Sequence, residues 1–278
     1  MTTINNKHVL ITGAASGLGR LLALRCAGLG ATVTIWDLDA AGGEAVAAEA
    51  TAVGPGRARA FACDVSDRTQ VYARAAEVLA NAGAVDILVN NAGVVSGREL
   101  LELDDERIER TLAVNALALF WVTKAFLPAM VAGGSGHVVT VASAGGLIGS
   151  PRMTDYAASK FAAVGFNEAL RLELKRSTPG VKTTIVCPFY IDTGMFEGVK
   201  TRFPLLLPIL HEQDVVERVV KAIQHDRPQV LMPWMVRALP AMRLLPVGVF
   251  DTLADFFGIT TAMDEFTGRE GAASGAGT

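Results

Sequence analysis

Short apolar runs of strand length alternate with helical patterns along most of this 278-residue chain. Such alternation is typical of βαβ units in a parallel sheet, and strands as uniformly apolar as HVVTVA suit a sheet covered on both faces. We predict one α/β domain over residues 1–262, built as a single doubly wound, Rossmann-like parallel sheet with helices on both faces. A flexible tail of small and polar residues should follow at 263–278. Strands are expected near 8–12, 32–36, 58–63, 86–90, 136–142, 181–187 and 229–232, and helices near 17–29, 40–52, 68–82, 105–131, 155–176 and 212–225.

A glycine-rich turn, TGAASGLG, joins the first expected strand to the first helix. It contains Gly13, Gly17 and Gly19, with Ser16 and Leu18 between them. A turn of this kind lets the backbone approach a pyrophosphate closely and points a helix N-terminus at the phosphates. The spacing G-x-x-x-G-x-G departs from the common G-x-G-x-x-G fingerprint, and glycines also make tight turns that bind nothing. An acidic residue after the second strand would favour a dinucleotide site.

Asp37 is that acidic residue. It ends the second strand eighteen residues after Gly19, where a carboxylate accepts hydrogen bonds from an adenosine ribose. Its charge would repel the 2′-phosphate of NADP, and Ser16 and Leu38 supply no compensating cation. The sequence therefore favours NAD as the cofactor.

The ends of the later strands also carry polar or turn-making residues. Asp64 ends the third strand, Asn91 the fourth and Ser143 the fifth, and Pro188 follows the sixth. Because ligands of doubly wound sheets bind beyond the carboxyl ends of the strands, these positions predict one continuous site.

Two of these strand ends have alternative structural roles. Asp64 and the backbone N–H of Val65 are suited to orient an adenine; the alternative for Asp64 is to cap the next helix, a role that Ser66 or Asp67 supplies more naturally. Asn91, Ala92 and Gly93 are expected to bring the backbone close to the cofactor. The side chain of Asn91 is better suited to tie neighbouring strands together than to take part in chemistry.

A tyrosine and a lysine one helical turn apart carry the candidate chemistry. Tyr156 and Lys160 lie at i and i+4 and share a helix face, so the ammonium is expected to favour the phenolate, with Ser143 thirteen residues upstream. A base that works near neutrality needs the phenol pKa lowered by about 2–3 units from its usual value of about 10, and the nearby lysine and a bound cationic nicotinamide are the expected sources. The same spacing also occurs in surface helices without function. Whether this pair is catalytic is therefore judged from the other motifs that accompany it.

The motifs occur together in the order of a known family. TGAASGLG, Asp64-Val65, NNAG at 90–93, Asn115, Ser143, Tyr156 and Lys160 make the chain resemble the short-chain dehydrogenase/reductase family over roughly residues 5–230. Segments 161–174 and 188–210 are similar to its retinol and hydroxysteroid dehydrogenase subgroup. The resemblance implies hydride transfer with a nicotinamide cofactor, and homodimers or homotetramers.

The resemblance also implies a role for each catalytic residue. Ser143 should donate a hydrogen bond to the substrate oxygen, and Tyr156 should exchange the hydroxyl proton. Lys160 should hold the nicotinamide ribose and lower the tyrosine pKa. Asn115, a polar residue in an apolar helical run, should hold a water that links the lysine to solvent; a bond to a backbone carbonyl in a kinked helix is its structural alternative.

The segment after the sixth strand should meet the nicotinamide. Pro188, Ile191 and Thr193 match cofactor-binding positions of the family, although Thr193 is also suited to cap a following helical turn. Phe189 stands where the family often has glycine, which should narrow the mouth of the site.

Two apolar segments follow on the substrate side. Residues 190–212, here called the lid, are expected to exclude water and grip an aliphatic substrate; packing on the core or on another subunit is the alternative. Residues 234–257, the C-terminal apolar segment, are broken by Pro240 and Pro246 and make a poor membrane-spanning helix. With Arg237 and Arg243 the segment suits a membrane interface, and it equally suits a cover for the pocket or a dimer seam.

Composition excludes several other classes of protein. A net charge of −3 gives no basic surface for nucleic acid. The three cysteines form no C-x-x-C and the four histidines have no ligand spacing, so neither disulfides nor a metal site is expected. The N-terminal residues show no signal peptide or membrane anchor. A cytoplasmic protein with possible peripheral membrane contact is expected.

The combined prediction is an NAD-dependent oxidoreductase that interconverts a lipophilic alcohol and its ketone or aldehyde. Secondary alcohols are the favoured substrates. One alternative is a reductase of small ketones or acyl chains. Another is a catalytically silent nucleotide-binding scaffold, which the intact Ser143, Tyr156 and Lys160 disfavour.

Overall fold

The computed structural model describes residues 1–268 and contains one seven-stranded sheet in which every neighbouring pair is parallel. The strand order is β3-β2-β1-β4-β5-β6-β7, so the chain winds outward in both directions from β1 and β4. This is the predicted doubly wound fold, and it is confirmed. The strands are β1 (His8–Thr12), β2 (Thr32–Asp37), β3 (Arg57–Ala62), β4 (Ile87–Asn90), β5 (Gly136–Val141), β6 (Val181–Pro188) and β7 (Gln229–Met232).

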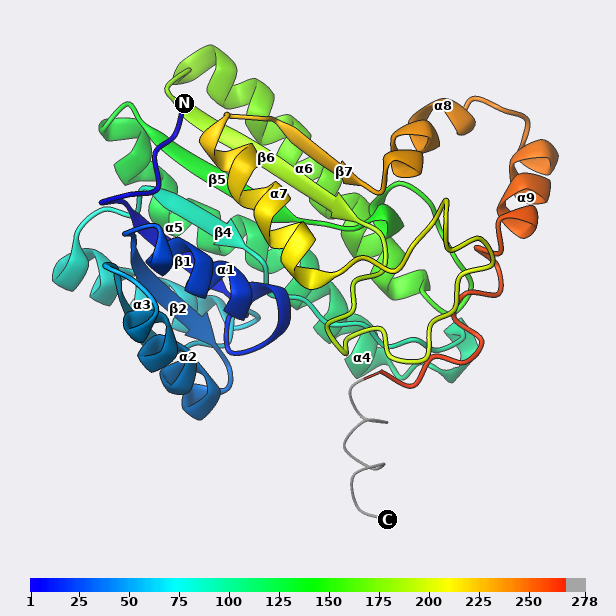
Figure 1. Ribbon diagram of the computed structural model, residues 1–278, viewed down its shortest axis with the longest axis horizontal. Coiled ribbons are helices and arrows are strands. Elements are labelled where there is room, and N and C mark those ends of the chain that lie inside the picture. Colours follow the sequence, from blue (N-terminus) through cyan, green and yellow to red (C-terminus); the bar gives the residue numbers. More distant parts are fainter. Residues whose placement is uncertain (269–278) are drawn as a thin grey trace.

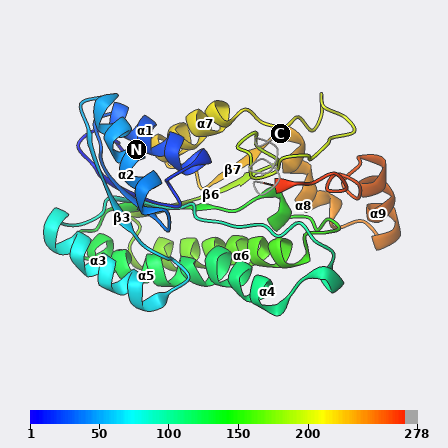
Figure 2. The same ribbon diagram turned by 90° about the horizontal axis from the view of Figure 1, so that it is seen from below.

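Helices cover both faces of this sheet, as Figure 2 shows. One face carries α1 (Gly17–Gly28), α2 (Ala40–Ala52) and α7 (Glu212–Gln224). The other carries α3 (Arg68–Ala82), α4 (Asp105–Leu112), α5 (Ala118–Ala132) and α6 (Thr154–Ser177). The uniformly apolar strands therefore bury side chains on both sides, as a parallel sheet requires.

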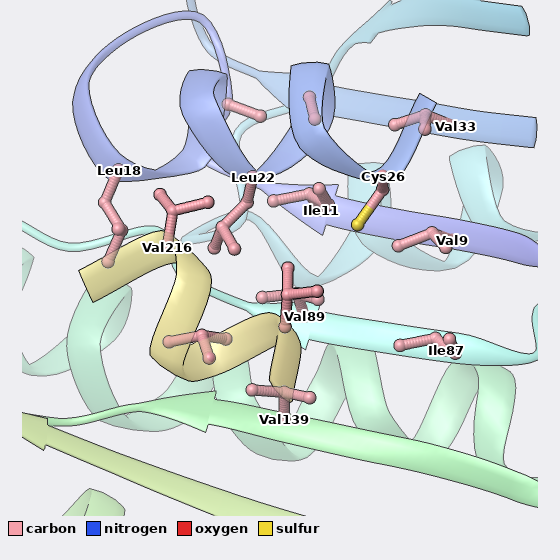
Figure 3. Close-up of a cluster of buried hydrophobic side chains, with 14 of the residues drawn as sticks. Val9, Ile11, Leu18, Leu22, Cys26, Val33, Ile87, Val89, Val139 and Val216 are labelled. Carbon is pink, nitrogen blue, oxygen red and sulfur yellow. The ribbon is translucent and has the colours of Figure 1, made fainter. Parts of the chain in front are cut away.

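Aliphatic side chains fill the layer between the sheet and its first set of helices (Figure 3). Leu22 and Cys26 of α1 lie over Ile11 of β1 and Val89 of β4, and Val216 of α7 closes the cluster. All five are buried, and burial of each large aliphatic side chain contributes about 1.5–3 kcal/mol. This packing fixes α1, and with it the glycine turn, above the first strand.

The long helix expected near 105–131 is interrupted. A π-helical turn, η2 (Ala113–Leu117), separates α4 from α5 and carries Asn115. Such turns occur often at functional sites because they displace a side chain or a carbonyl from the regular ladder. The stretch Asp105–Ala132 is the one helix of the described residues that is long and apolar enough to cross a membrane. Its buried residues Val122, Phe126 and Met130 pack on the sheet, which marks it as a core helix.

The C-terminal part of the chain departs from the regular alternation. The short helices η4 (Trp234–Ala238), α8 (Leu239–Met242) and α9 (Val247–Phe256) stand out from the side of the sheet, beyond the end of β7 (Figure 1). Two further 3-10 turns are η1 (Leu100–Glu102) and η3 (Ala144–Gly146).

The predicted start of the flexible tail, residue 263, lies too early in the chain. Met263 is 1% exposed, and Phe266 packs with Phe196 in the apolar cluster that contains Tyr156. These apolar side chains find cover beside the site, so the prediction of a free tail is wrong for residues 263–268. The remainder of the predicted tail, 269–278, lies outside the described residues.

Candidate active site

The carboxyl ends of the central strands open into a cleft of about 220 Å³. It lies where the strand order reverses between β1 and β4, the usual ligand position in a doubly wound sheet. The cleft is lined by most of the residues singled out from the sequence: Gly13, Ser16, Leu18, Gly19, Asp37, Asp64, Val65, Asn91, Ala92, Gly93, Ser143, Tyr156, Lys160, Pro188, Ile191 and Thr193.

The glycine turn is built on two positions that exclude a larger residue. Gly13 has φ of +65°, and a Cβ there would lie 2.7 Å from the Cα of Ala92. A Cβ at Gly19 would lie 2.3 Å from the carbonyl oxygen of Gly13 and 2.5 Å from Nδ2 of Asn91. These approaches let α1 begin directly above the end of β1.

The start of α1 suits a pyrophosphate. The first turn of this helix contains no acidic residue. The first N–H groups and the positive end of the helix dipole therefore suit an anion in the cleft. Together with the absence of space for side chains at Gly13 and Gly19, this donor set fits the phosphates of a dinucleotide.

Asp37 is held in place at the end of β2. Its carboxylate accepts hydrogen bonds from the backbone N–H groups of Ala15 (2.8 Å) and Asp39 (3.0 Å). Each oxygen keeps further acceptor capacity for a ribose hydroxyl. At the next strand end Asp67 caps α3, accepting from the N–H groups of Thr69 and Gln70. The capping alternative for Asp64 is thus wrong, and its carboxylate remains at the cleft.

Asn91 acts as a tie between strands. Its Nδ2 donates to the carbonyl oxygens of Thr12 and Gly13, both at 2.9 Å, and its backbone N–H donates to Oγ1 of Thr12 at 3.0 Å. The structural role expected for this side chain is what the geometry shows. Its bonds join the ends of β4 and β1 beneath the glycine turn.

Tyr156 and Lys160 reach the cleft from the first turns of α6, with Ser143 opposite them after β5. Both Tyr156 and Lys160 are 4% exposed, and Nζ of Lys160 lies 5.6 Å from the centre of the phenol ring. The lysine also donates to the carbonyl oxygen of Val141 at 3.0 Å. Oγ of Ser143 accepts from the N–H of Gly145 at 3.0 Å, which fixes the hydroxyl at the start of η3.

The expected lowering of the tyrosine pKa by Lys160 and a bound cationic nicotinamide stays a prediction, and burial acts against it. Burial raises the pKa of Tyr156 to about 12, and interaction with Ser143 opposes this shift only in part. Burial also lowers the pKa of Lys160 from 10.5 to about 8. Sequence spacing predicted the proximity of these two groups, but it did not include the cost of removing both from water.

Comparisons with known proteins agree with this geometry. A family model described as short chain dehydrogenase matches residues 7–202. The chain belongs to this family. Epidermal retinol dehydrogenase 2 from Homo sapiens is 45% identical over 264 residues, which cover 94% of this chain and 85% of the relative. Retinol dehydrogenase 10 from Homo sapiens is 41% identical over 285 residues, with 92% and 84% covered.

Solved structures of family members share the fold. A short-chain dehydrogenase from Burkholderia phymatum in complex with NAD has a TM-score of 0.78 at 28% identity, covering 88% of this chain and 95% of that one. A metagenomic short-chain oxidoreductase in complex with NADP has a TM-score of 0.70 at 30% identity, covering 83% and 98%. The protein is thus a short-chain oxidoreductase, and its resemblance to the retinol dehydrogenase-like subgroup is confirmed.

Asn115 of this dehydrogenase lies behind the cleft and does not line it. It is 1% exposed. Its Oδ1 accepts from the N–H of Val94, and its Nδ2 donates to the carbonyl oxygen of Val94 and to Oγ of Ser159. The side chain therefore has protein partners at both ends. Both Nδ2 hydrogens are used, whereas Oδ1 keeps one acceptor site for the water that the family resemblance implies.

Ser159 is a positioning residue that the sequence analysis missed. Its hydroxyl is fully buried, accepts from Asn115 at 3.0 Å and donates to the backbone carbonyl of Tyr156 at 2.7 Å. It thereby connects the π-helical turn to the catalytic helix. Its place in YAASK, between the tyrosine and the lysine, was the available signal.

Other predicted details also differ from the structure. Gly17 begins α1 but does not line the cleft. No helix follows Thr193, since residues 193–198 form turns, so its capping alternative is wrong. Phe189 and the lid residues Met195 and Phe196 line the cleft, and further lining residues of this dehydrogenase were not anticipated: Trp36, Leu38, Cys63, Val94, Arg110, Val114, Val141 and Ala142.

Proposed function

We propose that this dehydrogenase uses NAD to interconvert a lipophilic alcohol and its aldehyde or ketone, with Tyr156 as the acid and base. One observation carries the proposal. Ser143, Tyr156 and Lys160 share a single cleft with the glycine turn and Asp37. A proton-exchanging group and a dinucleotide site are therefore adjacent, as hydride transfer requires.

The residues that would hold the cofactor follow the strand ends. The first turn of α1 would bind the pyrophosphate, Asp37 the adenosine ribose, and Asp64 with the N–H of Val65 the adenine. Lys160 would hold the nicotinamide ribose. The nicotinamide end would meet the backbone at 91–93 together with Pro188, Ile191 and Thr193. When bound, the oxidised cofactor supplies a hydride acceptor and a positive charge next to Tyr156.

Asp37 supports the choice of NAD over NADP. The solved relatives include complexes with either cofactor, so family membership alone does not decide. Two unit charges 4 Å apart interact by about 4 kcal/mol at an effective dielectric constant of 20, and by about 1 kcal/mol in water. A 2′-phosphate beside the Asp37 carboxylate would meet repulsion in that range. We expect at least a tenfold preference for NAD.

Proton transfer in this site depends on positive charge. An ammonium about 5–6 Å away stabilises a phenolate by about 3 kcal/mol at a dielectric constant of 20, which equals about 2 pKa units. We expect Lys160 and the positive charge of the oxidised cofactor together to offset the burial that raises the phenol pKa to about 12. In alcohol oxidation Tyr156 accepts the hydroxyl proton, while Ser143 holds the substrate oxygen with a hydrogen bond.

The apolar surroundings support a lipophilic substrate. Phe189, Met195 and Phe196 line the cleft at the end where Ser143 and Tyr156 lie. The names of the relatives favour retinol, a primary alcohol with a long apolar tail, over the secondary alcohols that the sequence analysis favoured. A reductase of small ketones is the alternative, and a silent scaffold is disfavoured because all the catalytic groups are present.

The direct test is the formation of NADH with a panel of alcohols. We expect turnover with retinol or a secondary steroid alcohol, weaker turnover with short alcohols, and little with NADP. Preference for short ketones and NADPH would support the reductase alternative. Binding of NAD without turnover of any alcohol or carbonyl compound would contradict the proposal and support a scaffold.

Exposed apolar residues on α5 and α6 support a homodimer or homotetramer. Leu117 beside α5, Phe120 on α5 and Leu172 on α6 are each about half exposed. Exposed apolar side chains of this size often mark an interface between subunits. Light scattering of the purified protein should give the mass of two or four chains, and Phe120→Glu should lower it.

A second exposed apolar surface supports peripheral membrane contact of a cytoplasmic protein. Leu244 and Val247 of the C-terminal apolar segment are 87% and 75% exposed, and Leu205 of the lid is 96% exposed. Arg237 is also exposed, on the same segment. Apolar side chains with cations beside them suit an anionic lipid interface. Sedimentation with anionic vesicles should be reduced in a Leu244→Ser, Val247→Ser variant.

A further inference from the structure

Phe189 borders three separate cavities. It follows Pro188 at the end of β6, where its backbone N–H donates to the carbonyl oxygen of Met232 at 2.8 Å, and its ring centre lies 4.5 Å from that of Tyr190. Its side chain lines the cofactor cleft and also two smaller cavities beyond it. The residue that departs from the family pattern thus stands between the cofactor and the C-terminal part of the chain.

The three cavities are separate but share lining residues, so they are neighbours that follow one another outward from the cleft. The second, of about 30 Å³, includes Ser143 in its lining and therefore lies beside the hydroxyl expected to hold the substrate oxygen. The third, of about 40 Å³, lies further out. The two share four apolar residues, namely Ala144, Ile148, Phe189 and Ile259. A chain that starts at Ser143 would pass these residues to reach the third cavity.

The third cavity is lined without any polar side chain. Its outer wall comes from the C-terminal apolar segment: Met235, Val236, Leu239, Met242, Ala254 and Phe257. A water molecule there would find few hydrogen-bond partners, whereas an aliphatic chain would lose none. Two of the wall residues are methionines, whose unbranched side chains repack readily around a ligand.

We propose that this third cavity binds the apolar tail of the substrate and that the ring of Phe189 is the partition around which the tail turns. The inference rests on the proposed function and names its substrate class more narrowly. The substrate is an alcohol with an unbranched or flat apolar tail, because a branch near the hydroxyl would meet the Phe189 ring.

The cavity must widen to hold a tail, and its outer wall is attached in a way that allows this. Nη1 of Arg243 donates to the carbonyl oxygen of Leu147 at 3.1 Å, and its guanidinium lies 4.9 Å from the ring centre of Phe161. Oγ of Ser150 donates to the carbonyl oxygen of Ile259 at 2.8 Å. Few polar contacts hold this wall, so it is expected to move outward as a tail enters.

A series of straight-chain primary alcohols tests the tail site. Each methylene buried in an apolar cavity is worth about 0.8 kcal/mol, so kcat/KM should rise about fourfold for each added carbon until the cavity is full. A profile that is flat with chain length would overturn the proposal.

A matched pair of substitutions locates the site. Ala254 is buried and lines the third cavity, whereas Ala241 is exposed on α8. Ala254→Leu fills space for about two methylenes and should lower the ratio of kcat/KM for long and short alcohols about tenfold. Ala241→Leu adds the same side chain outside the cavity and should leave that ratio unchanged. Equal ratios in both variants would overturn the assignment of the cavity.

Removal of the Phe189 ring should widen the range of alcohols that the site accepts. Phe189→Ala should raise kcat/KM for alcohols branched next to the carbinol carbon, relative to straight-chain alcohols, by about tenfold. An unchanged ratio would contradict the role given to the ring.

Binding without turnover separates this inference from the proposed function. A long-chain alcohol alone should raise the midpoint of thermal unfolding more than a short one, and Ala254→Leu should abolish the difference while Ala241→Leu should not. If these shifts occur but NADH never forms, the proposed function fails and the tail site stands. If NADH forms but chain length and Ala254→Leu have no effect, the tail site fails alone.

Discussion

The two halves of the site are held by different kinds of interaction. On the cofactor half, short loops are fixed by hydrogen bonds between neighbouring strand ends, such as those from Asn91 to Thr12 and Gly13. On the substrate half, the lid and the C-terminal apolar segment meet mainly through aromatic rings, as where Phe203 contacts Phe256. Hydrogen bonds thus hold the first half, whereas packing of apolar rings holds the second.

The largest effect should come from the close packing of the cofactor half. In Gly19→Ala the new Cβ would collide with the backbone of Gly13 and Ala14 and with Asn91. We expect a loss of about 3 kcal/mol or more in the free energy of unfolding, together with loss of NADH binding. Gly28→Ala is the control in the same helix, because a Cβ there meets nothing within 4 Å. It should be neutral or stabilising by about 0.5 kcal/mol in denaturant unfolding. Equal effects of the two substitutions would contradict this view of the glycine turn.

Acid should lower the free energy of unfolding of the sheet, which supports both halves of the site. His137 of β5 is fully buried, and burial lowers its pKa from 6.5 to about 4. Between these values the unfolded chain binds a proton that the folded chain does not, so the free energy of unfolding falls as pH falls from 6.5 to 4. The loss from this group is about 3 kcal/mol. Burial lowers the pKa of His8 as well, which acts in the same direction.

Both histidines lie near the amino ends of their strands, away from the cleft. Urea unfolding as a function of pH would measure the slope, and His137→Gln should make it shallower. A stability that is constant from pH 6.5 to 4 would contradict the assignment of a buried neutral histidine. Unfolding of one half of the site at a higher pH than the other would contradict the view that both depend on the same sheet.

A smaller effect is expected where the lid meets α9. The ring of Phe203 lies 5.3 Å from that of Phe256 and 6.0 Å from that of Phe257. Such aromatic pairs contribute about 0.5–1.5 kcal/mol, so Phe203→Ala should lower global stability by about 1 kcal/mol. Hydrogen exchange should nevertheless become clearly faster in residues 190–212 and 234–257. Leu205→Ala, at a position 96% exposed in the same lid, should leave exchange unchanged. Faster exchange throughout the sheet would argue against a separately held substrate half.

The same contrast explains how much could be predicted from the sequence. The order of strands and helices follows from apolar periodicity. The cofactor half follows from local patterns such as TGAASGLG, in which the backbone conformation requires glycine at particular positions. The expected residues of that half line the cleft, apart from Gly17. Their roles toward the cofactor remain predictions.

What the sequence did not predict depends on contacts between distant segments. The packing of Met263 and Phe266 beside Tyr156 joins the end of the chain to the catalytic helix, and no local pattern signals it. The pKa values of Tyr156 and Lys160 depend on burial by several elements rather than on their i, i+4 spacing. The π-helical turn at Asn115 packs against α6, a contact with a distant segment that no local pattern signals.

Tyr156→Phe tests the central claim most directly, because it removes one hydroxyl from a buried ring and leaves its packing in place. The variant should bind NADH as the unmodified protein does, measured by cofactor fluorescence. Its alcohol oxidation should fall by about 100- to 10,000-fold, the usual contribution of a general acid or base. Turnover close to that of the unmodified protein, with NADH binding intact, would contradict the assignment of Tyr156 as the group that exchanges the substrate proton.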